Sequence, residues 1–337
     1  MLGRQLNLKI AVVGCGWSGI LLANSLSASH EVTVYEKNKE PKVVCACGIP
    51  TLAFRELSES CGLNANDYIK WTSKQLIMEL GKKTMHIPIT GLCTFDKLNF
   101  MKTIVGSTKA AFLFGETLNP ENHNKYDLIV DATGYRALLG RLATDKIYST
   151  YQIKAEFNDL PYPDFYLRFP SHEDLRVTKY LWMYPLSHNT AYVGCLSING
   201  KKAYNLVHSF LEETHATVLE EQAKLLRLNP PQESQPFING KIVGVGNSIG
   251  AITSVGEGNQ PATESVKLLS QNLTNLPQYQ RQVLKQLGWL KYDYKAYTAL
   301  TQNKILSNLT SLIKMQRIYR QRLQMNVNAQ SLRNFFR

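Results

Sequence analysis

The chain has 337 residues, of which 44% are hydrophobic, and it carries a formal net charge of +12 at pH 7. Its length corresponds to about two domains of ~150 residues, and no stretch of ~18 uninterrupted apolar residues predicts a membrane-spanning helix. The 6 cysteines form no CxxC pair, so neither a metal site nor a disulfide framework is indicated, and a reducing cytoplasm is favoured over secretion.

The first predicted element is the segment KIAVVGCGWSGILLANSLSASHEVTVYEK at residues 9–37. Basic residues before an apolar run, and the letters VVGC, are also typical of a secretory signal. That interpretation fails because Gly14, Gly16 and Gly19 interrupt the run, which leads directly into alternating strand residues ending on Glu36. The pattern predicts a strand, a glycine turn, a helix and a second strand that ends in an acid.

Such a pattern is typical of a dinucleotide-binding turn. Gly14 permits the tight turn, Gly16 lets backbone approach a pyrophosphate, and Gly19 allows the helix to pack closely on the strand. The amino terminus of the helix faces the phosphates with the positive end of its dipole. Glu36 follows ~20 residues on, where an acid accepts hydrogen bonds from ribose hydroxyls and repels a 2′-phosphate, which favours FAD or NAD over NADP. A glycine-rich turn without a ligand is the alternative.

The middle of the chain contains one predicted helix and several strands. The predictions are a loop at 42–50, a mixed region at 71–89, a helix at 95–105, and a buried strand followed by a turn at 126–142. Four strands follow at 151–157, 165–169, 179–186 and 190–198. The last two strands are separated by Ser187, His188 and Asn189, which predict a hairpin turn.

The second half of the chain returns to the nucleotide-binding pattern. Residues 204–226 are helical by length and periodicity, and residues 240–273 predict a strand, a glycine-rich turn and a helix. We therefore predict an α/β protein with three parts: a Rossmann-type nucleotide-binding domain at 1–75, 95–145 and 240–280, an interleaved antiparallel-sheet substrate domain at 76–94 and 146–239, and a C-terminal basic helical segment at 281–337.

The chain combines three dinucleotide-type motifs with an aromatic one. They are GCGWSG at 14–19 with Glu36, DATG at 131–134 with Arg141 after it, GVGNSIGAITSVGEG at 244–258, and YLWMYP at 180–185. Together they resemble the geranylgeranyl reductase family of flavoproteins, within the larger group that includes aromatic hydroxylases and flavin halogenases. YLWMYP is similar to the family's YxWxFP substrate-cavity motif, and CACGIP at 45–50 is similar to its cysteine-glycine segment near the flavin.

The resemblance implies a bound FAD and an isoprenoid lipid substrate. It implies that reduced FAD delivers hydride from N5 to one alkene carbon while a proton reaches the other. The implied catalytic and cavity residues are Cys47, Gly48, Tyr180, Trp182 and Tyr184. The implied cofactor-binding residues are Gly14, Gly16, Trp17, Ser18, Gly19, Glu36, Lys37, Cys47, Asp131, Gly134, Asn247, Gly256, Gly258 and Asn259.

Three features depart from the family pattern, one of them the absence of the arginine often found before the helix at 95–105. Asn247 stands where an aspartate normally contacts the ribityl chain of the flavin, and Ser254 precedes Val255 and Gly256 where the third motif usually has a proline. An amide still forms hydrogen bonds, so these changes affect the expected cofactor affinity rather than the cofactor class.

The aromatic motif and Cys47 each have a simpler interpretation. In a strand, Tyr180, Trp182 and Tyr184 fall on one face, where they form either ordinary core or, as the resemblance implies, the wall of a polyprenyl cavity. Cys47 either tunes the flavin, shapes the cavity or protonates a substrate carbon, or it is a small buried hydrophobe.

The C-terminal segment concentrates positive charge. From Lys291 onward the basic residues are accompanied by a single acid, Asp293. Apolar residues recur among them at helical spacing, at Ile305, Leu309, Leu312, Ile313, Tyr319 and Leu323. A basic amphipathic helix of this kind either lies on an anionic membrane surface or packs on the protein with its charges solvated. Nucleic-acid binding is not expected, because no recognised motif is present.

Three functions are compatible with these features. The leading hypothesis is FAD-dependent reduction of carbon-carbon double bonds in geranylgeranyl or polyprenyl groups of membrane lipids. The alternatives are a flavin monooxygenase or halogenase of the same fold and a non-catalytic flavin- or lipid-binding protein. No second nucleotide fold is visible, so we expect electrons from reduced nicotinamide or a redox protein. The expected location is the cytoplasm or the membrane periphery.

Overall fold

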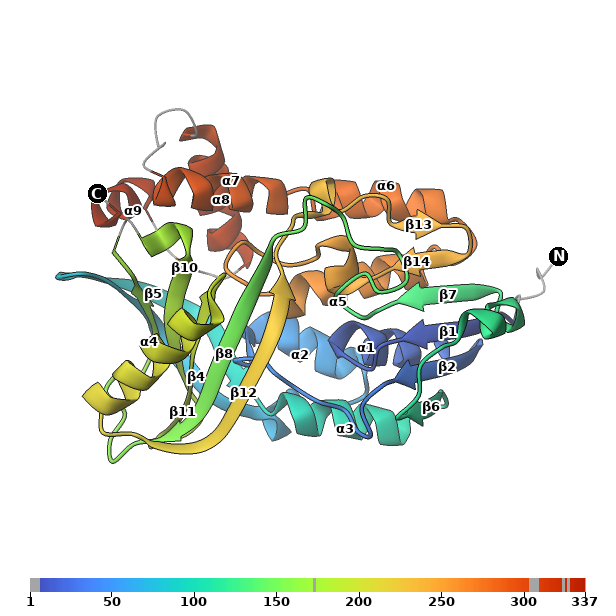
Figure 1. The fold of residues 1–337 in the computed structure, drawn as a ribbon, viewed down its shortest axis with the longest axis horizontal. Coiled ribbons are helices and arrows are strands. Elements are labelled where there is room, and N and C mark those ends of the chain that lie inside the picture. Colours follow the sequence, from blue (N-terminus) through green and yellow to red (C-terminus); the bar gives the residue numbers. More distant parts are fainter. Residues whose placement is uncertain (1–6, 172–173, 303–308, 323–324, 326–327, 337) are drawn as a thin grey trace. The chain divides into compact units, whose positions relative to one another are not determined.

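The computed structural model describes residues 7–171, 174–302, 309–322, 325 and 328–336 (Figure 1). The chain divides into two compact units, each built around its own β-sheet. The first unit comprises Met1–Val43, Lys97–Lys146 and Arg227–Leu290. The second unit comprises Val44–Asp96, Ile147–Leu226 and Lys291–Arg337.

Six strands form the sheet of the first unit. They are β1 (Lys9–Val13), β2 (Glu31–Glu36), β6 (Ala111–Phe114), β7 (Leu128–Asp131), β13 (Ile238–Asn239) and β14 (Ile242–Gly244). The strand order is β13-β14-β7-β1-β2-β6, and all neighbours are parallel except β13 and β14. Ile10, Val12 and Ile129 are fully buried, as expected for central parallel strands covered on both faces.

Four α-helices lie within the described residues of the first unit. They are α1 (Trp17–Leu26), α3 (Lys97–Ser107), α5 (Asn259–Ser270) and α6 (Leu276–Gln286). Helix α1 packs against α3 and α5, and α5 packs against α6. The predicted strand, glycine turn, helix and strand at residues 9–37 are therefore confirmed as β1, α1 and β2.

Eight strands form the sheet of the second unit. They are β3 (Gly48–Pro50), β4 (Ile69–Leu80), β5 (Lys83–Phe95), β8 (Ile147–Glu156), β9 (Phe165–Phe169), β10 (Thr178–Pro185), β11 (Thr190–Ser197) and β12 (Thr217–Arg227). The order is β12-β8-β11-β10-β9-β4-β5-β3. Strands β8 to β11 pair as antiparallel neighbours, whereas β4 and β9 are parallel.

The two faces of this sheet differ. Helix α4 (Gly200–Glu213) covers one face, where Val207 and Phe210 join a buried cluster that includes Leu181 and Met183 of β10. Because side chains alternate along a strand, the residues between them, including Trp182, lie on the opposite face. The predicted aromatic motif therefore occupies the face of the sheet that α4 does not cover.

Four further helices belong to the second unit or begin at its boundary. They are α2 (Thr51–Ser60), α7 (Leu290–Thr301), α8 (Leu309–Arg322) and α9 (Ala329–Phe335). Lys83 donates a hydrogen bond to the carbonyl oxygen of Asn334 (3.3 Å), and Phe336 meets Phe169 edge to face. The C-terminal segment is therefore packed on its own unit. Of the predicted apolar stripe, Ile305 and Leu323 lie outside the described residues.

The predicted fold class is confirmed, and so are most of the predicted elements. The helix at 95–105 is α3, and the four strands from residue 151 are β8, β9, β10 and β11. In the predicted hairpin the backbone N–H of Ser187 donates to the carbonyl of Thr190 (3.2 Å).

The prediction of one helix over 204–226 is wrong beyond Glu213. Helix α4 ends there, His215 adopts a left-handed backbone (φ 52°), and β12 follows. Glutamates and lysine favour a helix locally, but pairing with β8 decides the conformation of residues 217–227.

The compact units divide the chain differently from the predicted domain boundaries. Residues 44–75 lie in the second unit, because β3 pairs with β5 and α2 packs on both. Residues 227–239 and 281–290 lie in the first unit, and the helices after residue 290 lie in the second.

Candidate functional site

The first glycine turn has the geometry of a phosphate cradle. Gly14 has φ +105°, and a Cβ atom there would lie 2.8 Å from the carbonyl oxygen of Ala132. A Cβ on Gly19 would lie 1.9 Å from the oxygen of Gly14, so α1 packs too closely for any side chain. A Cβ on Gly16 would meet no atom within 4 Å. The backbone at Gly16 therefore borders open space at the amino terminus of α1, where an anion is stabilised.

The acid at the end of β2 is held beside this turn. Glu36 accepts a hydrogen bond from the backbone N–H of Cys15 at Oε2 (2.9 Å) and two from Asn38 at Oε1. Burial, and then the charge of Glu36, raise the pKa of the Cys15 thiol to about 12, so this thiol stays protonated at neutral pH. Oε2 keeps a lone pair for a hydroxyl donor, as ribose recognition requires, and Lys37 is exposed next to it in the chain.

A buried lysine connects three helices of the first unit. The ammonium of Lys97 on α3 donates to Oδ1 of Asn259 on α5 (2.5 Å) and lies 4.7 Å from the ring centre of Trp17 on α1. The Trp17 indole donates to the carbonyl of Asn259 (3.0 Å) and packs against Phe100. Trp17 and Asn259, both predicted cofactor residues, are therefore fixed by one another and by a lysine that no sequence motif indicated.

Asp131 organises the turn after β7. Its fully buried carboxylate accepts from the backbone N–H groups of Thr133, Leu138 and Leu139 and from the hydroxyl of Ser248. The same hydroxyl accepts from the N–H of Gly134 (3.1 Å), which has φ +72°. Asp131 therefore acts on the predicted site by fixing the shape of this turn, with most of its oxygen lone pairs already used.

The second glycine-rich segment packs on α1. A Cβ on Gly246 (φ +65°) would lie 2.0 Å from Oγ of Ser18, so only glycine fits against that helix. Gly256 has φ +83°, and Gly258 is the N-cap of α5, with no side-chain hydrogen bond capping the helix. The predicted residues of this segment and of the first turn thus lie together, at the amino termini of two adjacent helices.

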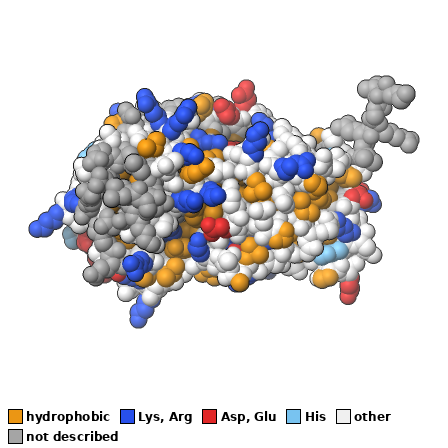
Figure 2. All heavy atoms as spheres, turned by 90° about the horizontal axis from the view of Figure 1, so that it is seen from above, with side chains coloured by type: hydrophobic (Ala, Val, Ile, Leu, Met, Phe, Trp, Pro, Cys, Tyr) orange, Lys and Arg blue, Asp and Glu red, His pale blue; other side chains and the backbone are white. Residues whose placement is uncertain are grey.

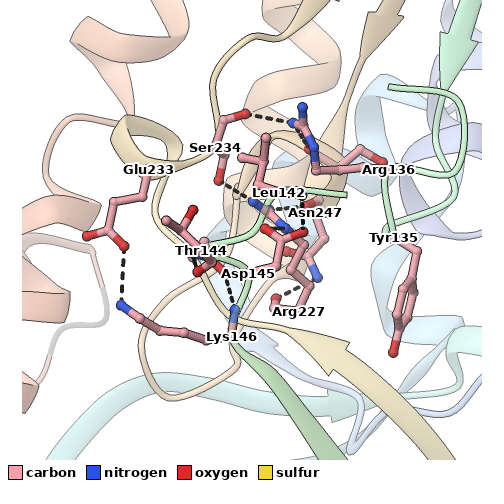
Figure 3. A network of polar contacts seen from close by, with 12 residues as sticks. Tyr135, Arg136, Leu142, Thr144, Asp145, Lys146, Arg227, Glu233, Ser234 and Asn247 are labelled. Atoms are coloured by element: carbon pink, nitrogen blue, oxygen red, sulfur yellow. Dashed lines mark hydrogen bonds and ion pairs between the residues drawn. The ribbon is translucent and has the colours of Figure 1, made fainter. Parts of the chain in front are cut away.

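Asn247 is held by a polar network (Figure 3). Its Nδ2 donates to the carbonyl of Arg227 (3.0 Å), and its own carbonyl accepts from Nη1 of Arg227 (3.2 Å). Its Oδ1 is buried and has no partner among the described residues. The amide is therefore oriented by Arg227 with an acceptor left over for a ligand hydroxyl.

Arg227 is itself paired inside the protein. Its Nε donates to Oδ1 of Asp145 (2.6 Å), and the two side chains are 0% and 3% exposed. Its Nη2 donates to Ser234, whose carbonyl accepts from a second buried arginine, Arg136. Burial, and then the charge of Arg227, lower the pKa of the Arg136 guanidinium.

In the second unit the aromatic residues of the motif lie on one face of the sheet. The ring of Tyr184 stacks on Phe165 at 4.3 Å, and Tyr180 lies 5.9 Å from Trp182. Trp182 covers Gly194 of β11, where a Cβ would lie 2.2 Å from the indole. Tyr180 and Trp182 are buried and Tyr184 is partly exposed, and the indole of Trp182 occupies the space that a side chain at position 194 would fill.

The Cys47-Gly48 segment contacts this surface. A Cβ on Gly48 would lie 3.1 Å from the Tyr184 ring, so a larger residue would displace the tyrosine. Cys47 has φ 58°, a left-handed conformation that is costly for a side-chain-bearing residue, and its thiol donates to the carbonyl of Cys45. That carbonyl also accepts from Nε2 of Gln152 on β8 (3.2 Å).

Two buried polar atoms lie on the same row of this sheet face. Trp182, Gly194 and Gln152 are aligned across β10, β11 and β8. The indole Nε1 of Trp182 and Oε1 of Gln152 have no hydrogen-bond partner among the described residues. A donor and an acceptor left over in a buried surface are suited to a ligand hydroxyl or to water.

Each group of predicted residues is thus assembled within its own unit. The glycine turns, Glu36 and Asn247 lie in the first unit, and Cys47, Gly48 and the aromatic motif lie in the second. Sequence reasoning missed Lys97, Arg227 and Gln152. Among the described residues no cluster of His, Cys, Asp and Glu side chains is arranged to hold a metal ion.

Comparison with solved structures gives the fold. A geranylgeranyl bacteriochlorophyll reductase-like protein from Thermoplasma acidophilum is similar with a TM-score of 0.69 and 15% identity, over 97% of this chain and 90% of that one. PqsL, a probable FAD-dependent monooxygenase from Pseudomonas aeruginosa, gives 0.64 and 14%, over 89% and 98%. CmlS, a flavin-dependent halogenase, gives 0.63 and 12%, over 88% and 65%.

The chain has the fold of these flavoproteins. The resemblance drawn from the sequence motifs is therefore confirmed at the level of fold. No protein-family model matches the chain, and no curated protein sequence matches it either.

Proposed function

We propose that the chain is an FAD-dependent oxidoreductase that reduces carbon-carbon double bonds of geranylgeranyl or other polyprenyl groups of lipids. The observation that carries the proposal is the aromatic surface of Tyr180, Trp182 and Tyr184, the first two of them buried, on a flavoprotein fold whose glycine turns fit a dinucleotide. A polyprenyl chain is apolar along its length, and burying it against such a surface contributes roughly 25 cal/mol per Å².

The residues of the first unit would hold the cofactor. The N–H groups at the start of α1 and α5 would face the phosphates, Glu36 would accept from a ribose hydroxyl, and Oδ1 of Asn247 would accept from a ribityl hydroxyl. When bound, FAD supplies the hydride that the reaction needs. In the second unit the aromatic surface orients the polyprenyl chain of the substrate and excludes bulk water. Nε1 of Trp182 and Oε1 of Gln152 would form hydrogen bonds with a hydroxyl group of the lipid or with a single water molecule.

The decisive experiment is anaerobic reduction of the flavin-loaded protein with dithionite, followed by addition of a geranylgeranylated lipid. We expect the flavin absorbance to return and the lipid mass to rise in steps of two hydrogens. Trp182→Phe, which keeps an aromatic ring but loses the indole donor, should slow reoxidation by roughly tenfold or more. His188→Ala, in the exposed hairpin turn, is the matched control and should have no effect.

A flavin that stays reduced until oxygen is admitted would overturn the reductase proposal. The second candidate is then oxygen-dependent chemistry, because a probable monooxygenase and a halogenase share the fold. Bound lipid with no tightly bound flavin would instead indicate a non-catalytic lipid-binding protein. In the reductase, electrons come from reduced nicotinamide or a redox protein, which stopped-flow reduction by each donor would distinguish.

We further propose that α8 rests on an anionic membrane surface, from which lipid substrates are taken up. Leu312 and Met315 are buried, while Lys314, Arg317 and Arg320 are exposed beside Ile313, which is 54% exposed. Figure 2 shows basic side chains among hydrophobic ones and few acidic ones on the face of the molecule seen there. Among the described residues no helix has the length and apolar character to cross a bilayer.

Vesicle cosedimentation tests this surface. We expect binding to phosphatidylserine-containing vesicles, loss of binding at high salt, and little binding to pure phosphatidylcholine, since each basic residue near such a surface contributes about 1 kcal/mol. Changing Lys314, Arg317 and Arg320 to Glu should abolish it. The same charge change at exposed Lys109, Lys125 and Lys201 is the control, and an equal loss there would contradict the assignment to α8.

A further inference from the structure

Strand β12 is a long exposed edge. It is the terminal strand of the eight-stranded order, spans 11 residues, and has no strand beyond it in the part of the chain that the structure describes. Val218, Leu219 and Leu225 are 47%, 48% and 51% exposed. An exposed edge with unpaired backbone groups and apolar side chains is a template for pairing with another chain, unless charges prevent it.

The charges on β12 favour one antiparallel pairing. We infer that β12 pairs in antiparallel fashion with β12 of a second copy of this chain, with Gln222 on the two-fold axis. In that register Glu220 lies opposite Lys224 of the other copy, and Lys224 lies opposite its Glu220. Opposite charges in directly opposed positions stabilise a sheet, and like charges destabilise it.

The apolar residues agree with the same register. Leu219 lies opposite Leu225, and Val218 lies opposite Leu226, so each exposed apolar residue meets another. A shift of the axis by one residue would instead put Leu225 opposite Glu221 or Thr217. The register is therefore specified by charge and hydrophobicity together.

Glu221 already has interaction partners within its own chain. It accepts from the hydroxyl of Tyr151 and lies 3.6 Å from Nε2 of His208. In the proposed register it is opposite Ala223, which offers neither attraction nor repulsion. Tyr204 of α4, 46% exposed and 5.1 Å from the Tyr151 ring, extends the apolar surface on this side of the strand.

The geometry gives a closed dimer rather than a fibre. The pairing uses the same strand of both copies, so it is isologous and consumes both β12 edges. The other edge of the sheet is β3, with only 3 residues, which is too short to continue the pairing.

Charge reversal tests the register in solution. Sedimentation velocity across a series of protein concentrations should show a monomer–dimer equilibrium for the unmodified chain. Glu220→Lys alone or Lys224→Glu alone creates two like-charge pairs and should raise the dissociation constant of the dimer by roughly tenfold or more. The double reversal restores opposite pairs and should restore the dimer. Glu212→Lys, an exposed change on α4, is the control and should leave the equilibrium unchanged.

Oxidative crosslinking gives an independent test. Gln222→Cys places two thiols face to face on the axis, so we expect a covalent dimer under mild oxidation, whereas Thr217→Cys at the far end of the strand should give none. A chain that is monomeric at every concentration, a dimer unaffected by either single reversal, or equal crosslinking at both cysteine positions would each overturn the inference.

Discussion

Replacing Gly16 by alanine is expected to weaken FAD binding at least tenfold, or about 1.4 kcal/mol, without unfolding the apoprotein. A Cβ at this position meets no atom within 4 Å, and the residue has φ −81°, which any amino acid adopts. The methyl group therefore costs the fold little, but it projects into the space where backbone would approach the pyrophosphate. Titration of the apoprotein with FAD, followed by flavin fluorescence, measures the effect.

Gly19→Ala is the informative counterpart. Its Cβ would lie 1.9 Å from the carbonyl oxygen of Gly14, so α1 would have to move away from the turn. We expect a clear fall in the thermal midpoint of the apoprotein as well as weak FAD binding. If Gly16→Ala also unfolds the chain, or if it binds FAD normally, the phosphate cradle is misplaced.

The parts of the fold that sequence reasoning predicted are those whose signals are local. The turn at Gly14 and Gly16 is specified by residues a few positions apart, and the hairpin at Ser187 follows from turn residues between two alternating runs. The length and periodicity of residues 204–226 predicted a helix that included the residues of β12, and Glu220, Glu221 and Lys224 do favour a helix locally. The conformation of β12 is decided by β8, which lies far away in the sequence.

The predicted site residues were found by motif, whereas their supports were not. Lys97 is buried between α1 and α5, and nothing in the surrounding sequence distinguishes it from a solvated lysine. Gly194, on which the Trp182 indole rests, carried a readable signal, because a glycine inside a strand often marks a close approach. The contacts of Lys97 with α1 and α5 leave no such signal in the sequence.

Asn247 shows how the structure explains a departure from a motif. Its Nδ2 donates to the carbonyl of Arg227, a hydrogen bond that an ionised aspartate could not make, since it has no donor. The amide therefore couples the glycine-rich segment to the buried pair of Arg227 and Asp145. The stability of that pair should consequently affect both folding and cofactor binding.

Replacing Asp145 by asparagine is expected to destabilise the chain by about 3–5 kcal/mol. The change leaves Arg227 buried without its counter-charge, and breaking one side of a buried ion pair costs this much because the remaining charge stays desolvated. The effect is increased by Arg136, a second buried guanidinium whose pKa is lowered by burial and then by the charge of Arg227. Chemical denaturation followed by circular dichroism measures the loss, and FAD affinity should fall with it because Arg227 orients Asn247.

Two further variants test whether the loss of stability comes from the burial of Arg227 or from the loss of an ion pair in general. Lys146 and Glu233 form an adjacent ion pair whose side chains are 56% and 49% exposed, so Lys146→Met should cost less than about 1 kcal/mol. Replacing both Asp145 and Arg227 with Leu and Met removes both buried charges and should be less destabilising than Asp145→Asn alone. Two results would contradict this explanation. One is an equal loss of unfolding free energy for Lys146→Met and Asp145→Asn, and the other is a larger loss for the double replacement than for either single one. Either would mean that desolvation of Arg227 is not the reason why Asp145 is needed.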